Sequence, residues 1–232
     1  MSAQDVYVAA WRAARRGATR TGLLTGLEGR PGWLAGHLRS LFAIHDVADM
    51  IHLDLAWWTY DAMRGVESFL ATRSSPVRVF EYGSGASTAW LARRADEVTT
   101  VEHDAGFGAY LASLLDPAWR VDLRVVEPVP STAPVAPSRR AGHQGLDFDH
   151  YVHAIDDVPG SFDLVVVDGR ARVACARHAL PRLRPDGLLV LDNANRTEYA
   201  SVVDDPSLDV RVLRGATPCL PYPTSTALLR HR

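Results

Sequence analysis

Acidic residues and a pair of glycines lie at the ends of two apolar segments in the middle of the chain. Glu81 lies near the end of the first segment, Gly83 and Gly85 follow it, and Glu102 comes directly after the second segment. Glycines after a strand let the backbone turn sharply and approach a ligand without a Cβ in the way. A carboxylate roughly twenty positions further on can accept hydrogen bonds from ribose hydroxyls. The pattern therefore predicts a site for a nucleoside cofactor.

The first turn differs from a dinucleotide-binding fingerprint. The position of the third glycine of a Gly-x-Gly-x-x-Gly motif is Thr88, and the strand before the turn carries an acid, Glu81. An acid at this point disfavours a pyrophosphate and favours a cationic or hydroxyl-rich ligand. A nicotinamide-dependent oxidoreductase remains an alternative, although the chain also lacks a Tyr-x-x-x-Lys pair.

Segments 81–88 and 101–104 resemble the cofactor-binding motifs of the class I S-adenosylmethionine-dependent methyltransferases. The resemblance covers about 77–193, and Ser87 stands where the family usually has its third glycine. It implies S-adenosylmethionine as the cofactor and a set of contact residues in these segments and after a later strand: Glu81, Gly83, Ser84, Gly85, Ser87, Thr88, Glu102, His103 and Asp168.

The fold expected from the pattern is α/β, a seven-stranded Rossmann-like methyltransferase sheet. From residue 77 onward, strand and helix patterns alternate, as in a mostly parallel sheet. The connection 215–224 is too short for a crossover helix, so the last strand should be antiparallel. Strands are expected at Val77–Tyr82, Glu97–Glu102, Val121–Val126, Phe162–Asp168, Gly187–Asp192, Leu208–Leu213 and Ser225–Arg230. Helical patterning at 5–16 and 33–71 predicts an N-terminal helical cap over 1–75, followed by an S-adenosylmethionine-binding methyltransferase domain over 76–232.

Three further oxygen ligands follow two of the expected strands. Asp168 ends one apolar strand, and Asp192 and Asn193 end the next. Because ligands bind outside the carboxyl ends of such strands, these side chains should share the cofactor cleft and could bind Mg²⁺. The arrangement resembles the metal-dependent catechol and caffeoyl O-methyltransferases. Those enzymes carry a lysine shortly after the first aspartate, whereas this chain has Arg170 and Arg172, so the alternative is that Asp192 and Asn193 cap the next helix.

Histidine is the natural candidate for a base in a chain without lysine. His150 and His153 follow the segment 128–145, which is rich in Pro, Ser, Ala and Arg and is expected to form a long loop or lid. We predict Asp168, His150 and His153 as the catalytic residues. Trp57 and Trp58 precede the first strand, and core packing is the favoured interpretation for them.

Composition excludes several classes of function. All 25 basic residues are arginine, so a Schiff-base lysine is absent, and the net charge of −2 without a basic module disfavours nucleic acid. The two cysteines do not suggest a disulfide framework, and the sequence contains neither a membrane-length apolar run nor a secretory signal. We therefore expect a cytoplasmic protein that does not bind membranes. These observations are compatible with a homo-oligomer.

The function predicted from these observations is methyl transfer from S-adenosylmethionine to a small-molecule acceptor, with a hydroxyl oxygen favoured. Oxygen is favoured by the acidic trio and by the absence of an Asn-Pro-Pro-Tyr-type motif after the fourth strand. Besides the oxidoreductase, the alternative is a protein that binds S-adenosylmethionine without catalysis.

Overall fold

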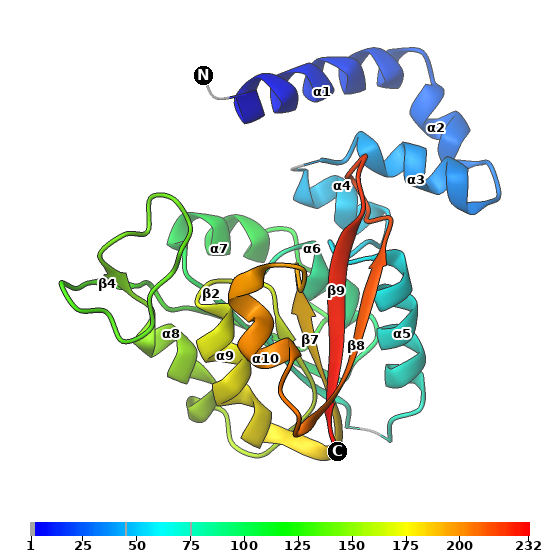
Figure 1. Ribbon diagram of the computed structural model, residues 1–232. Coiled ribbons are helices and arrows are strands. Elements are labelled where there is room, and N and C mark those ends of the chain that lie inside the picture. Colours follow the sequence, from blue (N-terminus) through cyan, green and yellow to red (C-terminus); the bar gives the residue numbers. More distant parts are fainter. Residues whose placement is uncertain (1–2, 45, 75) are drawn as a thin grey trace.

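The computed structural model describes residues 3–44, 46–74 and 76–232 (Figure 1). A seven-stranded sheet forms its centre, in the order β3-β2-β1-β6-β7-β9-β8. The strands of this sheet are β1 (Arg78–Tyr82), β2 (Glu97–Glu102), β3 (Val121–Val125), β6 (Phe162–Val167), β7 (Leu183–Asp192), β8 (Leu208–Gly215) and β9 (Thr224–His231). The predicted strands and the α/β class are confirmed.

The direction of the strands also agrees with the prediction. β1 pairs with β2 and β6 in parallel, whereas β9 is antiparallel to both of its neighbours, β7 and β8. The chain runs outward from β1 through β2 to β3, then returns and places β6 on the other side of β1. The order of the strands therefore reverses between β1 and β6, which is where open α/β sheets bind ligands.

Alternate residues along the buried strands face two different helical layers. Val79 of β1 packs toward α5 (Tyr60–Ala71) and α6 (Ala86–Ala92), whereas Phe80 and Tyr82 pack toward the opposite layer. That layer contains α8 (Asp149–His153), η1 (Ala154–Asp157), α9 (Arg172–Ala179), η2 (Leu180–Arg182), η3 (Thr197–Tyr199) and α10 (Ala200–Val203). α7 (Ala105–Ala112) covers β3. Because each buried strand has apolar residues on both faces, the core extends above and below the sheet.

Five helices precede β1. They are α1 (Ala3–Arg20), α2 (Leu23–Glu28), α3 (Trp33–Leu41), α4 (Val47–His52) and α5. The expected helix at 5–16 extends to Arg20, the 33–71 pattern is divided into three helices, and α2 lies in a segment expected to be a connection. α5 packs directly on the sheet through Val66 and Leu70, whereas α1 lies at the outside of the molecule (Figure 1). The boundary at residue 75 stays a prediction, but α5 shares the core of the sheet.

The segment expected to be a lid forms a small hairpin on the side of the sheet (Figure 1). β4 (Val129–Pro130) pairs with β5 (Leu146–Asp147), and the Asp147 carboxylate accepts the backbone N–H groups of Val135 and Ala136, each at 2.9 Å. Ala136 is buried and anchors the loop in the core, whereas most side chains of 138–145 are exposed.

Candidate functional site at the switch point

The ends of β1 and β6 meet in a close backbone contact. Gly83 has φ +93°, and a Cβ on it would lie 2.4 Å from the Cα of Gly169. A Cβ on Gly169 would in turn lie 2.0 Å from the Tyr151 hydroxyl. Glycine is thus required at both positions, at Gly83 by conformation as well as by space. Gly85 is different, because its φ of 172° is open to any residue and a Cβ there would meet nothing closer than 4.0 Å.

Glu81 lies beneath the glycine turn and is completely buried. Its carboxylate accepts hydrogen bonds from Ser87 Oγ and, at 2.6 Å, from Thr88 Oγ1. Thr88 Oγ1 also accepts the N–H of Gly85 at 3.0 Å. Burial raises the pKa of Glu81 from 4.5 to about 7, against the lowering effect of the hydroxyl groups. Glu81, Ser87 and Thr88, all predicted site residues, therefore form hydrogen bonds that hold the glycine turn on its buried side.

Glu102 at the end of β2 is 3% exposed and joins the two loops at the carboxyl edge. Its Oε2 accepts Ser84 Oγ at 2.8 Å and Ser84 N at 3.2 Å. Its Oε1 accepts the backbone N–H groups of His103, at 2.8 Å, and Asp104, at 3.0 Å. Burial alone would raise the pKa of Glu102, but His103, Ser84 and Asp104 outweigh it and the pKa is lowered. The carboxylate therefore stays ionised.

Aromatic and basic side chains gather next to Glu102. The His103 ring lies 5.5 Å from that of His143, on the hairpin loop, and 6.3 Å from that of Tyr151 on α8. Among the described residues, the Tyr151 hydroxyl, His143 Nδ1 and Arg170 Nε are buried without a hydrogen-bond partner. Buried polar atoms of this kind are uncommon in proteins, and these three belong to neighbouring residues around His103.

Arg172 lies between the two predicted acids of the neighbouring strands. Its Nη2 donates to Asp168 Oδ1 at 2.7 Å, and its Nη1 lies 3.7 Å from Asp192 Oδ2 and donates to the Asp192 carbonyl at 2.6 Å. The Asp168 side chain is 20% exposed and that of Asp192 is 5% exposed. Burial raises the pKa of both carboxyl groups, and at Asp192 the charge of Asp168 adds to that effect.

The remaining contacts of Asp192 are internal to the protein. Oδ1 accepts Thr226 Oγ1 at 2.9 Å, and Oδ2 accepts the amide of Asn193 at 2.6 Å. The side-chain oxygen of Asn193, Oδ1, accepts a hydrogen bond from Arg196 Nη2 at 2.9 Å. The structure thus brings Asp168, Asp192 and Asn193 together as predicted, but with a guanidinium between the acids. It gives no support to the predicted Mg²⁺ site, and neither Asp192 nor Asn193 caps the helix that follows.

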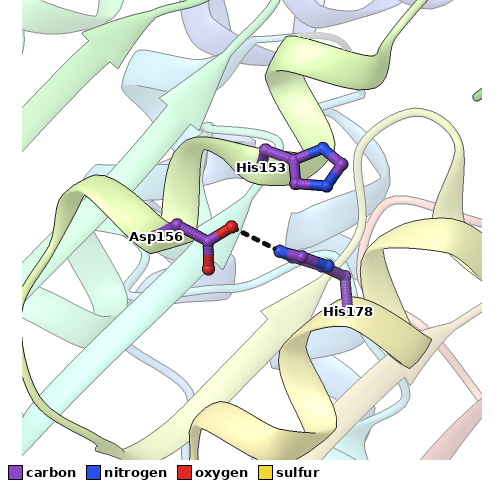
Figure 2. Close-up of side chains that lie close together, drawn as sticks. All are labelled: His153, Asp156 and His178. Atoms are coloured by element: carbon purple, nitrogen blue, oxygen red, sulfur yellow. Dashed lines mark hydrogen bonds and ion pairs between the residues drawn. The ribbon is translucent and has the colours of Figure 1, made fainter.

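The two predicted catalytic histidines lie elsewhere. His150 is exposed on α8, and His153 is exposed at the end of α8 with its ring 4.3 Å from that of His178 (Figure 2). His178 lies six residues after Arg172 on α9, or about 9 Å along the helix axis. Neither histidine joins the residues gathered at the carboxyl edge, where His103 and His143 lie instead. The hydrophobic periodicity and the composition of the sequence do not indicate which side of the five-residue helix α8 faces the site.

Comparisons with known proteins agree with this geometry. Residues 80–194 match the sequence model of a family described as a methyltransferase domain. This segment is a methyltransferase domain. It includes all of the predicted site residues, from Glu81 to Asn193, and the prediction of an S-adenosylmethionine-dependent enzyme is confirmed. No curated protein matches the sequence.

Two solved structures resemble the methyltransferase over nearly its whole length. An O-methyltransferase from Bacillus cereus, crystallised with SAH, has 16% identity and a TM-score of 0.55, with 97% of this chain and 100% of that chain covered. A candidate O-methyltransferase from Klebsiella pneumoniae has 17% identity and a TM-score of 0.53, with 97% and 98% covered. At these identities the likeness confirms the fold, a Rossmann-like methyltransferase sheet.

Some site residues of the methyltransferase were missed or underrated in the sequence. Gly169 and Tyr151 became part of the site only when the ends of β1, β6 and α8 were placed together. The Gly after Asp168 was a signal that could have indicated close backbone approach. Trp58 is fully buried against Trp90, as expected for core, and its indole also lies beside the Asp168 carboxylate, where it lowers the pKa of that group.

In the part of the chain that the structure describes, no helix is both long and apolar enough to cross a membrane.

Proposed function

We propose that this methyltransferase transfers the methyl group of S-adenosylmethionine to a hydroxyl oxygen of a small molecule, without a divalent cation. The observation that carries the proposal is Arg172, whose guanidinium contacts Asp168 and lies close to Asp192, the two carboxylates that would have to hold a metal. The likeness to two O-methyltransferases over 97% of the chain supports an oxygen acceptor.

The residues at the switch point fit a nucleoside cofactor. Glu102 stays ionised and can accept ribose hydroxyls if Ser84 Oγ turns away from Oε2. The open side of Gly85 leaves room for the cofactor's amino-acid part. The orphaned Tyr151, His143 and Arg170 atoms offer polar contacts from the loop side. When bound, the cofactor supplies an activated methyl group on a sulfonium.

Asp168 is our candidate for the group that receives the acceptor's proton. It is the more exposed of the two carboxyl groups, and burial raises its pKa from the ordinary value. A carboxylate whose pKa is closer to neutral is a better proton acceptor at physiological pH. Arg172 holds its position through Oδ1 and the backbone carbonyl of Asp168. Asp192, with all of its contacts internal, is assigned a positioning role.

Catalysis then consists mainly of alignment. Bound S-adenosylmethionine would supply its methyl group to the acceptor oxygen and be left as a neutral thioether, and Asp168 would take the hydroxyl proton. An oxidoreductase function is not favoured, because the third glycine and a lysine base are both absent. A binding protein without turnover is the remaining alternative.

The test is a transfer assay with methyl-labelled S-adenosylmethionine and a panel of phenols, alcohols and hydroxy acids, with and without exhaustive chelation. We expect labelled ether or ester products, the same rate after chelation, and loss of turnover in Asp168→Asn with little change in cofactor affinity. Loss of turnover on chelation that Mg²⁺ restores would contradict the metal-free mechanism. Cofactor binding without transfer to any acceptor would instead favour the non-catalytic alternative.

A further inference from the structure

We infer that the surface between α8, η1 and α9 holds a transition-metal site for an ion such as Zn²⁺, formed by His153, Asp156 and His178. Each residue offers one ligand atom, and the three atoms lie within 4.8 Å of one another. Among the described residues this is the only group of three or more histidine, cysteine or acidic side chains with such spacing. Figure 2 shows His178 and Asp156 facing each other, with the His153 ring beside His178.

The chemical identity of the ligands favours zinc over magnesium. Two imidazoles and one carboxylate are a donor set typical of zinc, with water in the fourth position, whereas Mg²⁺ and Ca²⁺ prefer oxygen ligands. His153 and His178 belong to two different helices, and the centroids of their rings lie 4.3 Å apart. Asp156 comes from η1, between the two.

Neighbouring groups orient the ligands. His153 Nδ1 lies 2.9 Å from the Asp149 carbonyl oxygen and 3.3 Å from Asp149 Oδ1, so Nδ1 carries the proton and Nε2 is left for a metal. Such a bond from the second ring nitrogen is usual for metal-binding histidines. Asp149 also adds a negative charge near the site.

The two oxygens of the Asp156 carboxylate contact two different partners. Its Oδ1 lies 3.1 Å from Arg182 Nη1, while its Oδ2 lies 2.7 Å from His178 Nε2. Arg182 is itself fixed by the carbonyl oxygens of Ile155, Val158 and Gly160. Oδ2 is therefore directed toward His178 whether or not a metal is bound. The positive charge of Arg182 opposes the cation, and Asp149 offsets it.

A bound ion would replace the hydrogen bond between His178 Nε2 and Asp156 Oδ2. Ligand atoms about 2.0 Å from a tetrahedral zinc lie about 3.3 Å apart, so this pair, now 2.7 Å apart, has to open by about 0.6 Å, while His153 moves inward. Both histidine side chains lie near the ends of their helices, and His153 is exposed. The ion would tie α8 and η1 to α9, away from the carboxyl edge where methyl transfer is proposed.

The experiment is equilibrium dialysis of the metal-free chain against Zn²⁺, with His153→Ala, His178→Ala and His150→Ala as variants. His150 lies on the same helix but outside the cluster and is the matched control. We expect one zinc per chain in the wild type, at least about tenfold weaker binding in His153→Ala and His178→Ala, and unchanged binding in His150→Ala. Added zinc should also raise the thermal midpoint of the wild type and of His150→Ala only.

A second readout identifies the ligands. Co²⁺ bound in place of zinc should give the intense visible absorption of a four- or five-coordinate site, and both cluster variants should lose it. Equal zinc affinity in wild type and His178→Ala would overturn the proposal, as would wild-type binding that is no tighter than that of the His153→Ala, His178→Ala double variant. Neither result bears on methyl transfer, which is tested separately.

Discussion

Gly83 and Gly169 bring the ends of β1 and β6 into backbone contact at the point where the order of the sheet reverses. Gly83 is held there by a positive φ and by the hydrogen bond from its N–H to the Val101 carbonyl at 2.9 Å. The contact aligns the turn that carries Ser84 and Gly85 with the loop that carries Asp168. The proposed cofactor and acceptor sides of the site therefore meet at one backbone contact.

Replacing Gly83 with alanine should destabilise the protein by about 2–4 kcal/mol, because the methyl group meets the Gly169 backbone and the left-handed conformation costs energy. Gly85→Ala is the matched control two residues away, and its extended φ and open surroundings predict a loss below about 1 kcal/mol. Urea denaturation of the two variants measures both values. Equal stabilities would show that the contact does not constrain the turn.

Replacing Arg172 with alanine should cost about 3–5 kcal/mol, because the partly buried Asp168 and the buried Asp192 would then face each other without a cation. Arg196→Ala removes an exposed arginine on the same edge and should change stability by less than about 0.5 kcal/mol. Added Mg²⁺ is not expected to restore the stability of Arg172→Ala. An Arg172→Ala variant as stable as the wild type would show that the guanidinium does not stabilise the two carboxyl groups.

Glu81 should make stability depend on pH. Its pKa is about 7 in the folded protein and 4.5 when exposed, so the folded state holds a proton between these values that the unfolded state has lost. The stabilisation is complete below pH 4.5 and decreases as pH rises toward 7, by at most on the order of 3 kcal/mol. Denaturation at pH 5 and pH 8 should show this decrease in the wild type, and a smaller one in Glu81→Gln. An equal change in the free energy of unfolding between pH 5 and pH 8 in the two proteins would contradict the raised pKa of Glu81.

Much of this architecture could be predicted from the sequence, because strands buried on both faces form continuous apolar runs. The strand at Phe162–Val167 is an example, and it ends within a residue of its expected boundary. Glu81, Glu102 and the trio at Asp168, Asp192 and Asn193 were found because the carboxyl ends of parallel strands share one edge.

What could not be predicted depends on side-chain direction. Arg172 was recognised as a replacement for lysine, but its position between two acids follows from the start of α9 and the left-handed conformation of Ala171. His153 was assigned to the site because it follows the loop in sequence, whereas the five residues of α8 direct Tyr151 inward and His153 outward. Tyr151 and His153 are two residues apart, or about 200° around a helix, so they face opposite sides.

The most direct test of the central claim, that the cofactor binds at the switch point through Glu102, is a calorimetric titration of S-adenosylhomocysteine into wild type, Glu102→Gln and Glu97→Gln. Glu97 lies at the opposite end of the same strand and is the matched control. We expect wild-type affinity in Glu97→Gln and about 10- to 100-fold weaker binding in a folded Glu102→Gln, since a charge-assisted hydrogen-bond pair contributes about 1.5–3 kcal/mol. Unchanged affinity in Glu102→Gln, with its fold confirmed by circular dichroism, would contradict the account.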